Sequence, residues 1–407
     1  MKRNLLAIAI PALLVAAGAN ASIEVWNKDG NKVDFYGRVK AANHITDRGQ
    51  DGEGDDTSAR LGMSGQTQIT DGITGYGRWE YEAKAGKNSD NEVRYAFAGL
   101  NFGDFGSFDY GRNDGVLKAI TAYTDVLPEF GGEAANNTWN VLSARTKAVA
   151  TYRNNNLFGL TDDVSFALQY ADNGDNSATF DGKRANAVYG PEITDPISGD
   201  KYKDFDGFKG DSREAFGAVV EWRIFDTGLT AAAGYAQTAG KSKYEEGGEV
   251  KKAKTWTAGI KYDNYNVYLA ANYFQTKFNT WDEKGVDGDR YNDPKIKGFE
   301  LVAQYGIDLE VGRLTPSVAY VQHKLANVGE WDYDADHKEG RNLAKYVSVG
   351  ATYDLNKNFS AIVEYKFNLL KKYDVGAELN TTRESSGRHP FKPGTKDVLG
   401  VGLIYQF

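Results

Sequence analysis

Apolar and polar residues alternate along most of this chain with a period of two. The segments KVDFYGRVKA, RLGMSGQTQI and FELVAQY follow this pattern, as do the last ten residues, VLGVGLIYQF. Similar segments begin near Thr74, Arg94, Ser107, Arg145, Val164, Ala215, Leu229, Trp256, Val267, Thr315, Tyr346 and Phe359. Alternation over such short runs is typical of half-buried β-strands. The pattern therefore predicts an all-β protein of about sixteen strands.

The connections between the predicted strands alternate between short and long. Short turns include TDG at 70–72 and DLNKN at 354–358. The long, polar connections are 42–58, 82–93, 111–144, 171–214, 237–255, 275–297, 323–345 and 368–396. Outer-membrane barrels sort their connections in this way, and a sheet can cross lipid only if it closes. We predict a 16-stranded antiparallel transmembrane β-barrel with its apolar face towards lipid and an aqueous lumen.

The N-terminus has the pattern of an export signal. Lys2 and Arg3 precede a short apolar run, and Ala19-Asn20-Ala21 provides a small-x-small cleavage site. We therefore predict a signal peptide at 1–21 and a barrel at 22–407, located in the cell outer membrane. Aromatic residues close to the predicted strand ends suit interfacial girdles. These residues are Trp79, Tyr81, Tyr170, Trp222, Tyr235, Tyr262 and Tyr365.

Composition narrows the classes of function. The net charge of −8 argues against nucleic acid as a partner, and the lack of cysteine removes disulfides, thiol catalysis and thiolate metal sites. The four histidines, His44, His323, His337 and His389, have no nucleophile signature around them, so we expect no enzyme, cofactor or metal. A sugar-specific channel is a second interpretation. It would need an aromatic track in the lumen, whereas most aromatics here alternate outward.

Charged residues suggest where a pore would narrow. Alternation places Arg38, Arg60, Arg94 and Arg145 towards the lumen, with Arg78 beside Glu80. The stretch YTDVLPEFGGE spaces Asp125, Glu129 and Glu133 by four residues and bends at Pro128, Gly131 and Gly132. Taken alone, the acids could belong to a solvated external loop, and the arginines to a structural salt-bridge network.

The chain resembles the trimeric general porins of enterobacterial outer membranes over essentially its whole length. The likeness is carried by NKDGNKVDFYG, ARLG, TGYGRWEYE, AFAGL, GSFDYGRN, YTDVLPEFGG, KYD with YLAANY, and the terminal YQF. The resemblance implies a general diffusion porin, a water-filled channel for ions and small hydrophilic solutes.

The resemblance also implies roles for individual residues. The third long loop folds into the barrel, with Asp125 and Glu129 as its pore-facing acids and Glu133 as a weaker third. The four arginines match the basic cluster opposite the loop, although Lys is more common at the first position. Arg78 stands where a neutral residue is expected, which leaves the usual cation preference open.

Assembly and partners follow from the same resemblance. Arg112 matches a contact to the second loop of a neighbouring subunit, and the C-terminal Phe407 matches an assembly signal. Small residues on the outward faces would let the subunits of a homotrimer approach closely; these are Gly37, Ala41, Gly65, Gly75, Gly77 and Gly99. Lipid and lipopolysaccharide would cover the remaining outer surface, and the long loops could serve as receptors for phages or bacteriocins.

Overall fold

The structure is a computed structural model. It describes residues 22–48, 52–86, 91–136, 140–172, 185–194, 201–210, 214–238, 250–280, 295–326, 342–371 and 394–407. The predicted signal peptide, residues 1–21, lies outside these ranges, and so do His337 and His389. No helix in the described ranges is both long enough and apolar enough to span a membrane.

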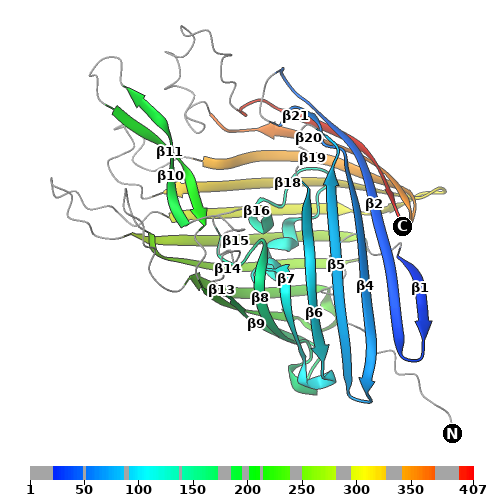
Figure 1. Cartoon of the computed structure of the whole chain (residues 1–407). Helices are drawn as coiled ribbons and strands as arrows, with labels where there is room; N and C mark the ends of the chain where they lie inside the picture. Colours follow the sequence, from blue (N-terminus) through cyan, green and yellow to red (C-terminus); the bar gives the residue numbers. More distant parts are fainter. Residues whose placement is uncertain are drawn as a thin grey trace.

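Sixteen antiparallel strands follow one another around a closed barrel (Figure 1). The barrel closes where the last strand pairs with β2, through Arg38–Ile45 and Leu399–Gln406. This confirms the predicted architecture. The barrel strands are β2 (Asn31–Ile45), β4 (Ser58–Thr70), β5 (Ile73–Lys84), β6 (Glu92–Asn101), β7 (Ser107–Asp114), β8 (Arg145–Asn154), β9 (Val164–Ala171), β12 (Ala215–Arg223), β13 (Leu229–Thr238), β14 (Val250–Asn264), β15 (Val267–Thr280), β16 (Lys295–Tyr305), β18 (Arg313–Ala326), β19 (Asn342–Asn356), β20 (Phe359–Asn368) and β21 (Val398–Gln406).

The two ends of the described chain share one position in the barrel. The short strand β1 (Ile23–Lys28) pairs with the first part of β2, and β21 pairs with its second part. Phe407 exchanges backbone hydrogen bonds of 2.8 and 3.0 Å with Gly37 where they meet. Its ring lies 2.6 Å from the point that a Cβ of Gly37 would occupy, so a larger residue at 37 would displace the terminal ring. The alternation pattern did not predict β1.

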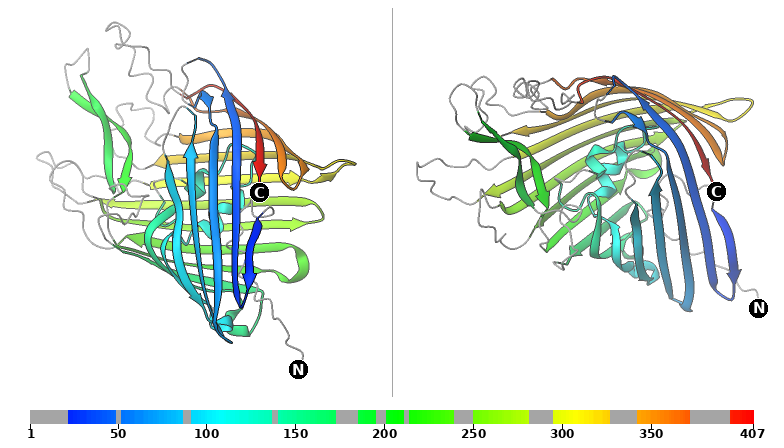
Figure 2. Two further views of the ribbon diagram at one scale, coloured as in Figure 1. Left: turned by 45° about the vertical axis from the view of Figure 1, so that its right-hand side comes forward. Right: turned by 45° about the horizontal axis from the view of Figure 1, so that its top comes forward.

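Several strands are longer than their apolar patterns, because backbone pairing outside the hydrocarbon layer does not require apolar side chains. Strand β14 begins six residues before Trp256, and β19 begins four residues before Tyr346. The predicted loop 171–214 also contains a hairpin of β10 (Ala185–Thr194) and β11 (Lys201–Gly210). This hairpin forms a two-stranded sheet of its own, which is visible in Figure 2. Small elements occupy other connections: β3 (Gly54–Asp55), β17 (Ile307–Asp308) and the 3₁₀ turns η3 (Gly103–Phe105), η5 (Leu157–Gly159) and η6 (Phe225–Thr227).

One face of the sheet carries exposed apolar side chains, as the alternation predicts. Leu61, Val220 and Leu403 are 42%, 52% and 50% exposed. Several of the predicted girdle aromatics are exposed on the same face, and Trp79 stacks on Tyr81 at 6.3 Å between ring centroids. In water such a surface would be unfavourable over a whole barrel, whereas lipid covers it at no cost.

Strand β6 departs from simple alternation at Arg94. Glu80 pairs with Tyr95 but Tyr81 pairs with Val93, so Arg94 is the extra residue of a β-bulge. Beyond the bulge the faces of β6 are exchanged relative to the prediction. Gly99 therefore faces inward, where its Cβ would lie 2.8 Å from the Tyr76 ring. Its assignment to the outward, subunit-facing surface was wrong.

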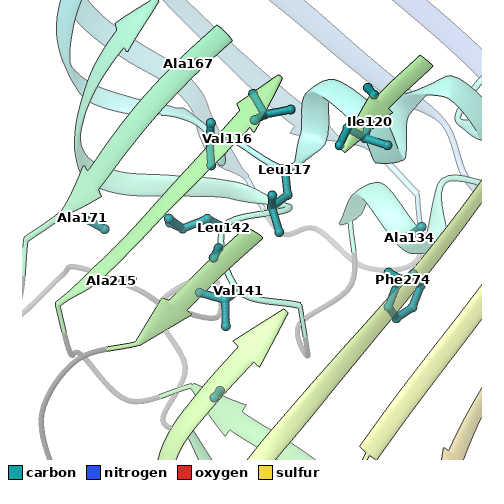
Figure 3. Packing of buried hydrophobic residues seen from close by; sticks show 14 of the residues in the cluster. Val116, Leu117, Ile120, Ala134, Val141, Leu142, Ala167, Ala171, Ala215 and Phe274 are labelled. Atoms are coloured by element: carbon teal, nitrogen blue, oxygen red, sulfur yellow. The ribbon is translucent and has the colours of Figure 1, made fainter. Parts of the chain in front are cut away.

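The third long connection packs against the inner face of the barrel wall, along the strands that follow it in the chain. It contains α1 (Lys118–Thr121), η4 (Ala122–Thr124) and α2 (Glu133–Asn136). Leu117, Ile120 and Leu142 are fully buried against β9, β12, β13, β14, β15 and β16, on the sheet face opposite the exposed apolar belt. Figure 3 shows part of this cluster. This part of the third connection therefore lies against the inner face of the barrel wall.

Candidate functional site

The predicted bends in the third connection are present. Gly131 and Gly132 adopt φ values of +97° and +73°, a region that strains other residues. A Cβ on Gly132 would lie 2.3 Å from a carboxylate oxygen of Asp125. The loop therefore folds back on itself tightly, and Asn136 donates a 3.2 Å hydrogen bond to the Asp125 carboxylate.

Two buried glutamates on the wall hold the backbone of this loop. Glu364 on β20 accepts hydrogen bonds from the amides of Glu129 and Phe130 at 2.7 and 3.0 Å. Glu300 on β16 accepts one from the amide of Ala134 at 2.9 Å and lies 2.9 Å from His323 Nε2. Both glutamates have no exposed surface. The sequence analysis missed these anchors; their only signal is an acid on the polar face of an otherwise apolar strand.

The resemblance implied that Glu129 faces the pore. In the structure its carboxylate is not presented to open water. Its side chain is 1% exposed, and one oxygen lies 2.9 Å from Lys40 Nζ and 2.8 Å from His44 Nε2. Lys40 also contacts Asp56 at 2.5 Å. Burial acts to raise the pKa of Glu129, but the His44 hydrogen bond and the Lys40 charge outweigh it and lower this pKa below its ordinary value.

The other predicted acid of the loop, Glu133, is also turned to the wall. It accepts a 2.6 Å hydrogen bond from the hydroxyl of Tyr346 on β19. Burial raises its pKa above the ordinary value, and the nearby charge of Glu300 acts in the same direction. The expectation that Glu133 faces the pore is therefore wrong. His44, Asp56 and Glu129 have the spacing of a metal-binding group. The ammonium group of Lys40 already lies between the two acids.

Strand register assembles the arginines on the facing wall. Arg38, Arg60, Glu82 and Glu92 lie directly opposite one another across β2, β4, β5 and β6. Glu82 contacts Arg60 at 2.8 Å and Arg38 at 3.8 Å. Like charges opposite one another destabilise a sheet, so an acid next in the row stabilises it. The sequence analysis assigned Glu82 and Glu92 to a loop and missed both.

The bulge in β6 directs Arg94 into the same cluster. Its guanidinium lies 2.6 Å from Glu80 and 2.7 Å from Glu82. Bulges commonly change the direction of a side chain in this way. Glu80 itself is 2% exposed and lies among the arginines. It is therefore a partner of the basic cluster and not part of an opposing acidic surface.

Arg78 is held by aromatic residues as well as by an acid. Its guanidinium carbon lies 4.2 Å from the centroid of the Tyr95 ring, and its nitrogens contact Glu80 and the Tyr36 hydroxyl at 2.7 Å each. Gly62 makes this possible, since its Cβ would lie 2.2 Å from the Tyr36 ring. The additional positive charge of Arg78 is therefore held on the lumen face by Tyr36, Glu80 and Tyr95.

Glu92 connects two further predicted residues. It lies 3.0 Å from Arg145 and 3.3 Å from Arg112. Arg112 also donates a 2.6 Å hydrogen bond to the carbonyl of Val93. The residue expected to contact a neighbouring subunit thus pairs with the end of the second loop in its own chain.

The loop and the arginine wall enclose a cavity of about 930 Å³. Asp125, Pro128, Glu129 and Gly131 line it from the loop. Arg38, Arg60, Arg78, Arg94 and Arg145 line it from the wall. Glu133 and Gly132 do not belong to this lining. Among the described residues, Asp125 is the loop acid that lines the cavity without an ion pair.

These features define a class of protein. A closed sixteen-stranded barrel with an apolar outer belt spans an outer membrane. Its charged cavity lies between the third connection and the arginine wall. Residues 28–407 match the family model described as Gram-negative porin, and the chain belongs to this family.

The relatives are outer-membrane porins. The chain is 40% identical to the putative outer membrane porin protein NmpC of Escherichia coli and 40% identical to outer membrane protein F of Serratia marcescens. Both matches cover all of this chain and all of the relative. A solved structure of Salmonella typhi OmpF in complex with daunomycin matches with a TM-score of 0.67 and 33% identity, over 95% of this chain and all of that chain. The protein is therefore a non-specific diffusion porin of the cell outer membrane and not an enzyme.

Proposed function

We propose that the cavity between residues 115–136 and the arginine wall is the constriction that selects solutes in this porin. The observation that supports it is the arrangement of five cavity-lining arginines opposite a loop that is hydrogen-bonded to the far wall. Charges inside a narrow passage with low-dielectric walls act on ions with little screening. Small hydrophilic solutes pass, and bulky apolar solutes disturb the ordered water and pass poorly.

The acids of this constriction are distributed unevenly. Glu80, Glu82 and Glu92 lie on the same wall as the arginines, and Asp125 is the cavity-lining loop acid that has no ion pair with any described residue. Part of the positive charge is therefore balanced within the wall. The field across the passage then arises between Asp125 and the remaining positive charge of the wall.

The test is the reversal potential of channels in a planar bilayer across a tenfold salt gradient. The double substitution Arg60→Ser with Arg94→Ser should raise conductance and shift permeability towards cations. Arg313→Ser is the matched control, because this arginine is 39% exposed at the first position of β18 and pairs with Asp308. The proposal fails if the double variant and the control have the same reversal potential.

We also propose a homotrimer. Gly65 and Gly77 lie directly opposite each other on β4 and β5, which leaves a flat spot on the outward face. Such a spot lets two barrel walls approach closely, and cyclic symmetry would repeat the contact. Gel mobility without heating should show a species about three times the monomer mass, and Gly65→Trp should weaken it. Light scattering that gives a monomer in mild detergent would contradict the proposal.

The remaining surface partners follow from the location. Lipid and lipopolysaccharide would contact the exposed apolar belt, and the long connections would be the parts accessible to phages or bacteriocins. A liposome binding assay with and without lipopolysaccharide checks the first of these expectations.

A further inference from the structure

Glu82 occupies the centre of the arginine wall. It lies on β5, directly opposite Arg60 on one side and Glu92 on the other. Its side chain is 8% exposed, so the carboxylate lies behind the guanidinium groups and outside the cavity lining.

Within the described part of the chain, both oxygens of Glu82 contact arginines. One oxygen lies 2.8 Å from Arg60 Nη2 and 3.8 Å from Arg38 Nη2. The other lies 2.7 Å from Arg94 Nη1. One carboxylate thus draws three guanidinium groups towards the wall.

Glu80 also contacts three arginines, but unlike Glu82 it accepts a hydrogen bond from a tyrosine. It contacts Arg60, Arg78 and Arg94, and it also accepts a 2.8 Å hydrogen bond from the Tyr36 hydroxyl. Substituting Glu80 would therefore also disturb the half-buried Tyr36. In the described part of the chain Glu82 accepts no hydrogen bond from a tyrosine, and its contacts are to Arg38, Arg60 and Arg94.

Repulsion between the arginines gives Glu82 its importance. Arg38 and Arg60 are cross-strand neighbours and Arg94 lies beside them, so each would extend into lumen water if no acid held it. Long side chains that extend into a passage narrow it and bring their charges closer to a passing ion.

We propose that Glu82 is a positioning residue that sets both the width and the ion preference of the constriction, by holding three arginines flat against the wall. The proposal rests on the proposed function, because it assigns the charge balance of the same constriction. It adds a residue that acts through the arginines and does not itself line the passage.

The test compares Glu82→Gln with Asp34→Asn in full-length channels in a planar bilayer. Asp34 lines the same cavity and pairs with Lys32 at 2.9 Å, so its neutralisation removes one charge without a recorded contact to the arginines. Glu82→Gln should raise the anion-to-cation permeability ratio about two- to fivefold, the effect of one unit charge several ångströms from an ion in a water-like dielectric. It should also lower conductance at 1 M salt, where the Debye length is about 3 Å and geometry dominates. Asp34→Asn should leave conductance at 1 M salt unchanged.

The possible outcomes separate the two proposals. If Glu82→Gln and Asp34→Asn behave alike in conductance and ion preference, the positioning role is overturned, whatever the arginine variants do. If Arg60→Ser with Arg94→Ser also has no effect, the proposed constriction itself fails. Glu82→Asp covers the case in which Glu82→Gln does not fold. It keeps the charge but shortens the reach, so conductance at 1 M salt should fall, and ion preference in 0.1 M salt should shift towards anions by less than in Glu82→Gln. Unchanged conductance in Glu82→Asp would also overturn the positioning role.

Discussion

Glu364 should control whether the tip of the third loop stays on the barrel wall. Its carboxylate accepts the amide hydrogens of Glu129 and Phe130 at 2.7 and 3.0 Å, and it is fully buried. Ser348 donates its hydroxyl to the other oxygen. The substitution Glu364→Ala removes the acceptor and leaves two amides at the loop tip without a partner.

The expected magnitude follows from the number of bonds. A hydrogen bond to a charged group contributes about 1.5–3 kcal/mol, so two of them contribute about 3–6 kcal/mol to the closed state of the tip. Each 1.4 kcal/mol is a factor of ten. Opening of the tip should therefore become at least about a hundredfold more frequent. The contacts of the Glu129 side chain with Lys40 and His44 remain, so the opening is local.

Hydrogen exchange of the peptide that covers the loop tip measures this opening directly. Protection of the amides at 129 and 130 should fall at least about a hundredfold in Glu364→Ala, and single-channel current should become noisier. Ser348→Ala is the matched control, because it removes a partner of Glu364 without touching either amide. A fall in protection of less than about tenfold, or an equal fall in both variants, would refute the reasoning.

Three further predictions concern other parts of the chain. Gly62→Val should push the Tyr36 ring away and lower the free energy of unfolding by about 2–5 kcal/mol through overpacking and a lost hydrogen bond; urea unfolding measures it. Gly72→Val is the control, since nothing lies within 4 Å of its Cβ position, and equal destabilisation would contradict the prediction. Because the pKa of Glu129 is lowered, its ion pairs stabilise the loop above pH 4.5 and lose that contribution as the pH falls through the folded pKa, so loop exchange should rise in acid. Glu129→Gln should lack this rise. The exported protein should begin at Ser22, which a measurement of its intact mass checks. A mass that includes the apolar run would contradict this prediction.

The architecture was predictable from the sequence because the period of two survives wherever a strand separates lipid from water. Strand number, closure and the sorting of connections by length all follow from that one constraint. The predictions that failed concern the faces of single strands. The bulge at Arg94 exchanges the faces of β6, and no alternation pattern signals a bulge in advance. Gly99 was therefore assigned to the wrong face, while Arg94 reached the lumen through the bulge itself.

The site was predictable in part. The arginines lie on the polar faces of their strands, so alternation and resemblance together found them. The direction of a loop acid is set by partners distant in sequence. Glu129 turns to Lys40 and His44, which are 89 and 85 residues away. Only the folded chain brings those groups together, and the resemblance alone gave Glu129 an open, pore-facing role.

The location of the acids follows from the density of the arginines. Arg38, Arg60 and Arg94 converge within one small area of the wall, and their mutual repulsion at an effective dielectric near 20 amounts to several kcal/mol. An acid across the passage is too far away to offset this, so the compensating carboxylates must lie on the same wall, which is where Glu80 and Glu82 are. A loop acid is then free to anchor the loop, as Glu129 does. The stability of the basic wall and the selectivity of the passage therefore depend on the same carboxylates, and substitutions that tune ion preference should also move side chains.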